Sequence, residues 1–157
     1  MATVSMGPSR VIISSASRDL LIAALRGLSD AAMTSRAPDR YVAAHLAALR
    51  AAAAVVAARA KPTSRRTRVR SVWTLLANVA PELKEWAAFF DTSARTRAEA
   101  EAGVSSAVTD RAADDLMRDA ETFIELVATT LGIDHQMYVD VLDVHAVHAV
   151  HAVRTAS

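Results

Sequence analysis

The sequence contains no cysteine in its 157 residues and only four glycines and four prolines. The absence of cysteine excludes structural disulfides, thiol nucleophiles and cysteine-based zinc or iron–sulfur sites, and it is typical of a cytosolic protein. So few glycines leave no Gly-rich phosphate-binding loop, and no metalloprotease helix, nucleophile elbow or paired-carboxylate spacing is present. The sequence therefore predicts no cofactor, no metal site and a cytoplasmic location.

Long apolar runs are also lacking. A membrane span needs roughly 18 consecutive apolar residues, whereas the uncharged run over residues 51–58 is short and rich in alanine. Residues 1–16 contain no basic region followed by a long apolar core, so they do not match a secretory signal. We therefore expect a soluble protein without a membrane partner.

The length corresponds to one domain, large enough to fold on a hydrophobic core alone. We predict a flexible leader over residues 1–16, a helical bundle over residues 17–132 and a low-complexity tail over residues 133–157. The tail repeats His-Ala-Val three times from His145 to Val153. Histidines three apart on a helix could share a divalent metal, but a strict triplet repeat at a chain end more often carries no selected site, which we favour here.

Hydrophobic periodicity predicts helices throughout this bundle and no strand. The expected helices cover residues 17–35, 38–61, 69–79, 81–103 and 109–132. They give an all-α, up-and-down four- to five-helix bundle without a sheet. The expected N-caps are Ser17 and Thr109, and the expected helix ends are Gly103 and Gly132. The expected layer of large core side chains consists of Trp73, Trp86, Phe89 and Phe90.

Residues 38–61 form the segment around which we expect the bundle to be organised. Pro38 suits a first helical turn because it has no N–H to leave unpaired. The alanine run over residues 51–54 extends the helix without adding bulk, so a neighbouring helix or a second copy can approach closely. At about 100° per residue, one apolar stripe is predicted to face the core, with Tyr41 and His45 at its edge. Its members are Val42, Leu46, Leu49, Ala53 and Val56.

Three segments carry a resemblance to a known family. They are Asp39-Arg40-Tyr41-Val42-Ala43-Ala44-His45-Leu46, Arg70-Ser71-Val72-Trp73-Thr74-Leu75-Leu76 and Pro81-Glu82-Leu83-Lys84-Glu85-Trp86-Ala87. Through them, the chain resembles an actinobacterial branch of the HEPN superfamily of small all-helical domains over roughly residues 17–132. The resemblance implies a helical bundle that usually dimerises. It also implies that active members are metal-independent ribonucleases with an Arg-x4–6-His motif, a spacing that Arg40 and His45 match.

Arg40 and His45 are thus the candidate catalytic residues. In a ribonuclease, His45 would act as general base or acid on an RNA 2′-hydroxyl or leaving oxygen, because its pKa is ordinarily near neutral. Arg40 would stabilise negative charge on the phosphate. The two side chains point roughly 140° apart around one helix, so a joint site would need a second chain or an irregular first turn. We favour the alternative, a packing histidine hydrogen-bonded to a neighbour and a solvent-facing arginine, because the sequence offers no second acid–base group.

The basic residues are concentrated in one half of the chain. Residues 1–70 carry a net charge of +9 and the remainder −8, within a total of +1. The candidate nucleic-acid-binding residues lie in and beside one expected loop, and they are Lys61, Arg65, Arg66, Arg68 and Arg70. Such residues neutralise phosphates and release counterions. A solvated connector is the alternative, which we favour because the loop contains no aromatic residue for base stacking.

Three functions remain open at the level of sequence. The leading hypothesis is a HEPN-like helical module that forms a homodimer and associates with RNA, DNA or a nucleic-acid-processing protein. The second is a metal-independent HEPN endoribonuclease with a composite Arg40–His45 site. The third is a protein–protein adaptor that uses the aliphatic segment 137–144 as a docking helix.

Overall fold

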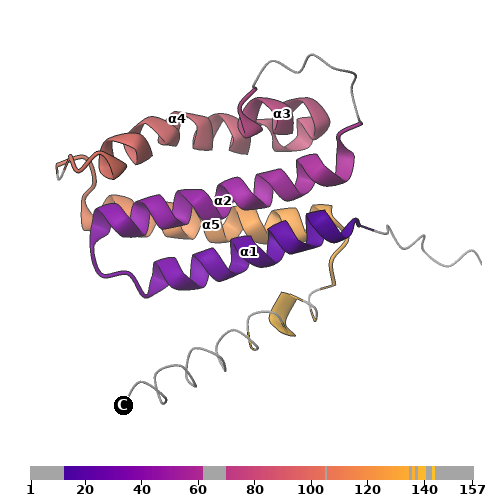
Figure 1. Cartoon of the computed structure of the whole chain (residues 1–157), viewed down its shortest axis with the longest axis horizontal. Helices are drawn as coiled ribbons and strands as arrows, with labels where there is room; N and C mark the ends of the chain where they lie inside the picture. The colour runs from indigo at the N-terminus through magenta and orange to yellow at the C-terminus, as the bar shows by residue number, and fades with distance from the viewer. Residues whose placement is uncertain are drawn as a thin grey trace, which may run out of the picture.

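A computed structural model of the chain describes residues 13–61, 70–104, 106–134, 136, 138–140 and 143. These residues form α-helices and one short 3-10 helix, and no strand occurs among them. In Figure 1, α2 lies between a layer made of α3 and α4 and another layer made of α1 and α5. The predicted all-α bundle is confirmed.

Helix α1 spans Ser15–Ala32 and begins two residues earlier than the sequence predicts. Ser14, rather than Ser17, is its N-cap, because the Ser14 side chain accepts a hydrogen bond from the Ser17 backbone N–H. Ser17 is fully buried instead, and its hydroxyl donates to the Ala54 carbonyl oxygen at 2.7 Å. Helix α1 packs antiparallel against α2, and Ser17 joins the two helices by a buried polar contact.

Helix α2 spans Ala37–Arg59 and contacts each of the other α-helices. Its buried face differs from the predicted one. The stripe from Val42 to Val56 is only half-buried, whereas the fully covered face of the helix is mostly alanine. The buried residues of α2 are Tyr41, Ala44, His45, Ala47, Ala48, Ala51, Ala52, Ala54 and Val55. The prediction was wrong because it ranked faces by side-chain size, while the neighbouring helices approach α2 where its side chains are smallest.

The layer of α3 (Val72–Val79) and α4 (Lys84–Glu101) also contains the 3-10 helix η1 (Pro81–Leu83). Ser71 caps α3 by accepting from the Thr74 N–H. Aromatic rings fill the space between this layer and α5. The Phe90 ring stacks on Trp73 with centroids 5.1 Å apart and meets Phe123 of α5 at 5.2 Å. Of the predicted aromatic layer, Trp73 and Phe90 are buried and Trp86 is partly buried against them, whereas Phe89 is 41% exposed.

Helix α5 spans Asp110–Thr130 and lies beside α1 in the other layer. Thr109 caps it as predicted, since its side chain accepts a hydrogen bond from the Ala112 N–H. The two glycines that were expected to end helices both adopt positive φ, with +82° at Gly103 and +68° at Gly132. Only glycine takes this left-handed conformation readily, so each position stops the helix before it.

By length and composition, α2 is the one helix within the described ranges that could cross a membrane. Half of its apolar window is buried inside the bundle. The core helix of a globular bundle meets the same criteria, so a single such helix is weak evidence for a span. The contacts of α2 with α1, α3, α4 and α5 identify it as the central helix of this fold.

Candidate functional site

His45 lies inside the bundle, facing α4. The side chain is 1% exposed, and its Nε2 lies 2.9 Å from the Phe90 carbonyl oxygen. Because a carbonyl can only accept, Nε2 carries the proton and donates it. The rings of Trp73 and Phe90 meet the imidazole edge-on at 5.8 and 5.9 Å. His45 therefore occupies the position of a packing histidine bonded to a neighbouring helix.

The surroundings of His45 favour its neutral form. Burial is the largest influence and lowers the pKa of the imidazole below its ordinary value, against a smaller upward effect of the bond to Phe90. The charge of Arg97 lowers this pKa further and that of Glu101 raises it. Nδ1 is buried without a hydrogen-bond partner in the described part of the chain. Protonation would place an uncompensated charge in the aromatic layer.

Arg40 lies on a different side of α2 and binds the start of α5. Its guanidinium forms ion pairs with Asp110 at 3.2 Å and Asp114 at 3.0 Å, and its side chain is 12% exposed. The same group donates to the carbonyl oxygens of Thr34 and Ser35. The expected solvent-facing arginine is thus a clamp that holds the α1–α2 turn against α5.

Within one chain, the two candidate catalytic residues are not brought together. Arg40 interacts with the N-terminus of α5, and His45 interacts with the middle of α4. The arginine whose charge acts on His45 is Arg97, which the sequence did not single out. No spacing rule could have identified Arg97, because its position depends on how α4 packs against α2. The catalytic role of Arg40 and His45 stays a prediction.

The candidate nucleic-acid-binding residues fall partly outside the described residues. Lys61 follows α2 and Arg70 precedes α3, and both are exposed. The other three candidates lie in the range 62–69, outside the described residues, and they are Arg65, Arg66 and Arg68. The three histidines of the tail repeat lie in a second range outside the described residues, 144–157. In the part of the chain that is described, no group of three or more acidic or histidine side chains could hold a metal.

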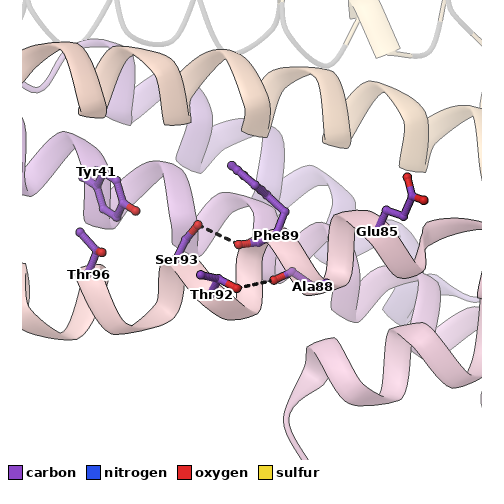
Figure 2. Close-up of a pocket in the computed structure, with 7 residues that line it drawn as sticks. All are labelled: Tyr41, Glu85, Ala88, Phe89, Thr92, Ser93 and Thr96. Carbon is purple, nitrogen blue, oxygen red and sulfur yellow. Dashed lines mark hydrogen bonds between the residues drawn. The ribbon is translucent and has the colours of Figure 1, made fainter.

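A surface hollow that the sequence did not indicate lies beside α4. It has a volume of about 490 Å³, and Tyr41 of α2 lines it together with residues of α4. Figure 2 shows its lining, which consists of Tyr41, Glu85, Ala88, Phe89, Thr92, Ser93 and Thr96. The spacing of these α4 positions places them on one face of the helix. The sequence predicts that Phe89, a residue of this face, lies in the core.

Comparison with models of known protein families gives a match over much of the chain. The family model described as SAV_6107-like HEPN matches residues 31–128, from the end of α1 to nearly the end of α5. No curated protein and no solved structure matches the chain. The matched range contains the Arg40 clamp, His45 and the aromatic layer, and it covers more than half of the sequence. The chain therefore belongs to the SAV_6107-like HEPN family.

Proposed function

We propose that this protein is a non-catalytic HEPN module that self-associates and binds nucleic acid. The observation that carries the non-catalytic part is that Arg40 and His45 both make contacts that hold the fold together. His45 is enclosed by aromatic rings and bonded to Phe90, and Arg40 is committed to two carboxylates of α5. A general base must reach the proton that it removes, and a neutral imidazole at 1% exposure does not reach a bound RNA.

The half-buried stripe of α2 supports self-association. Val42, Leu46, Leu49, Ala53 and Val56 fall within a sector of roughly 80° at 100° per residue, so they form one continuous aliphatic ridge. All five are partly exposed, and α1 packs on a different face of α2, where Ser17 bonds to Ala54. A ridge of this kind buries more apolar area when a second copy packs on it.

Substitutions in the ridge test this proposal. Leu46→Asp and Leu49→Asp would each place a carboxylate in the seam between two copies, so we expect the variants to be monomeric where the parent protein is dimeric. Sedimentation velocity over about 5–200 µM would measure the distribution. Leu126→Asp is the matched control, because Leu126 is 37% exposed on α5, away from the ridge. A parent protein that is monomeric at the highest concentration would contradict the proposal.

The basic segment supports the nucleic-acid part. Lys61 and Arg70 are exposed at its two ends, and residues 1–70 carry a net charge of +9. We expect RNA affinity to fall steeply as salt rises from about 50 to 200 mM, because binding releases counterions. Alanine at Lys61, Arg65, Arg66, Arg68 and Arg70 should flatten that dependence by close to one unit of slope for each phosphate that is no longer neutralised.

A matched control tests whether RNA binding depends on this segment or on any exposed arginine of the protein. Alanine at Arg95 and Arg111, whose side chains are 88% and 92% exposed on α4 and α5, should leave the salt slope unchanged. Fluorescence anisotropy with a labelled single-stranded RNA provides both slopes. An affinity that ignores salt, or that falls equally in the control variant, would rule out the segment as the binding surface.

A metal-independent ribonuclease is the second candidate, because the Arg-x4-His spacing is present. Labelled RNA incubated with the protein in excess EDTA would distinguish the two functions. A binding module leaves the RNA intact. Cleavage that persists in EDTA and disappears in a folded His45→Gln variant would replace the non-catalytic proposal with the enzymatic one.

A further inference from the structure

The hollow beside α4 presents mainly hydrogen-bond acceptors. The Thr92 hydroxyl donates to the Ala88 carbonyl oxygen at 3.0 Å, and the Ser93 hydroxyl donates to the Phe89 carbonyl oxygen at 2.9 Å. Both bonds are drawn in Figure 2. Since each hydroxyl has used its only proton on its own helix, each oxygen offers lone pairs to a ligand. The hollow therefore favours a ligand that is rich in donors.

Glu85 adds negative charge at one end of the hollow. Within the described ranges, its carboxylate has no ion pair or hydrogen bond, although it lines the cavity. The neighbouring Glu82 differs, because it is paired with Arg59. Glu85 is thus an anion that no described residue pairs with, on an acceptor-rich surface, and the ligand that complements this surface is a cation.

Phe89 provides a fixed aromatic surface in the same hollow. Its ring is held edge-on by Trp86 at 6.1 Å and by Phe90 at 5.0 Å, and the side chain is still 41% exposed. Large apolar side chains this exposed are few in the described residues. A cation placed over an aromatic ring is attracted by the ring quadrupole. The exposed ring of Phe89 therefore offers a surface on which a cationic ligand can stack.

We propose that this hollow binds an arginine side chain supplied by a partner protein. The guanidinium stacks on Phe89 and donates to the Glu85 carboxylate, which lies one helical turn away. The hydroxyl oxygens of Thr92 and Ser93 lie about 10–12 Å from Glu85 along α4, so they accept from backbone N–H groups of the same partner segment. The Tyr41 hydroxyl closes the opposite end, as Figure 2 shows. Arginine fits better than lysine, because a planar group with five N–H donors can stack and bond at once, whereas a lysine ammonium is a single, strongly hydrated point charge.

Titration of the full-length protein with short blocked peptides tests the proposal. The probe is a hexapeptide with one central arginine among glycines and serines, compared with otherwise identical lysine and citrulline peptides. Backbone amide chemical shifts in ¹⁵N-labelled protein report the binding position. We expect saturable shifts at residues 85–96 and at Tyr41, with the arginine peptide binding at least about tenfold more tightly than the citrulline peptide, which lacks the charge.

Two variants and a control connect the binding to the named groups. Glu85→Gln removes the charge and Phe89→Leu removes the aromatic face, and each should weaken the arginine peptide about tenfold. Both positions are exposed, so the fold is expected to persist. Asp91→Asn, an exposed acid of α4 that does not line the hollow, should bind as the parent does. Equal affinity for the citrulline peptide, an unaffected Glu85→Gln variant, or shifts centred outside the hollow would each overturn the proposal.

Discussion

At the scale of single residues, His45 is the group whose ionisation the fold opposes most clearly. Its folded pKa is lowered by burial, while in the unfolded chain it returns to about 6.5. As the pH falls below about 6.5, the unfolded state therefore gains a proton that the folded state does not accept. The contribution of His45 to stability is fully present above that pH and is lost progressively below it.

This linkage gives a measurable prediction. Between pH 7.5 and 5.5 we expect the free energy of unfolding to fall by up to about 1.4 kcal/mol for each pH unit below 6.5. Urea denaturation at a series of pH values measures the slope. His45→Gln keeps a donor for the Phe90 carbonyl but does not titrate, so its slope should be clearly smaller. A parent protein whose stability is flat or rises toward pH 5.5 would contradict this account of His45.

For single residues, the sequence predicted the direction of a side chain around its helix better than it predicted the residues that this side chain contacts. Helical geometry placed Arg40 and His45 on different sides of one helix, and the structure agrees, because the two residues bind α5 and α4 respectively. The same geometry could not predict that Arg40 would meet Asp110 and Asp114. Those acids are 70 and 74 positions away in the chain, and only the packing of α2 on α5 brings them close.

At the scale of elements, the α1–α2 contact depends on small side chains. Gly27 of α1 lies against α2, and a Cβ built there would lie 3.6 Å from the Ala47 Cβ, which is an ordinary contact. Its closest neighbour would be the Arg50 Nη1 at 2.9 Å, and Arg50 is an exposed, flexible side chain that can move. The interface therefore has room for one methyl group but little more.

Substitution of Gly27 should reveal that margin. Gly27→Ala is expected to stabilise the protein by about 0.5–1 kcal/mol, because alanine favours a helix over glycine and meets no fixed obstacle. Gly27→Val should destabilise it by about 1–3 kcal/mol, since its extra methyl groups collide with Ala47. Chemical denaturation measures both. Gly103→Ala is an opposite-sign control, because φ is +82° there. Destabilisation by Gly27→Ala would show that the Arg50 position is rigid.

The error over the buried face of α2 also belongs to this scale. Alanine and the larger aliphatic residues are distributed all round the helix, so hydrophobic periodicity identifies it as a helix without saying which side the neighbours cover. By contrast, α5 separates charged from apolar residues, and its apolar stripe, which includes Leu116, Phe123 and Val127, is buried. A face can be predicted from sequence where charge marks the opposite side.

At the scale of the whole molecule, the fold combines two kinds of packing. Helices α1, α2 and α5 meet largely through alanine and leucine, while α3 and α4 are joined to α5 through rings. The helix order and the all-α class followed from periodicity, caps and short connections, which are local properties. The aromatic layer was predicted as a set of residues, but Phe123 was not placed in it, because only the tertiary packing of α5 brings its ring to those of α3 and α4.

The layered arrangement predicts unequal local stability. Phe90 is fully buried and contacts rings from α2, α3, α4 and α5, so Phe90→Leu should destabilise the protein by about 1–3 kcal/mol. Its loss removes the rings' common partner, and we expect amide hydrogen exchange to accelerate more in α3 and α4 than in α1, α2 and α5. Phe89→Leu, the same change at an exposed ring, should alter stability by less than about 0.5 kcal/mol. Exchange that accelerates equally in all five helices would mean that the two layers open together as one cooperative unit.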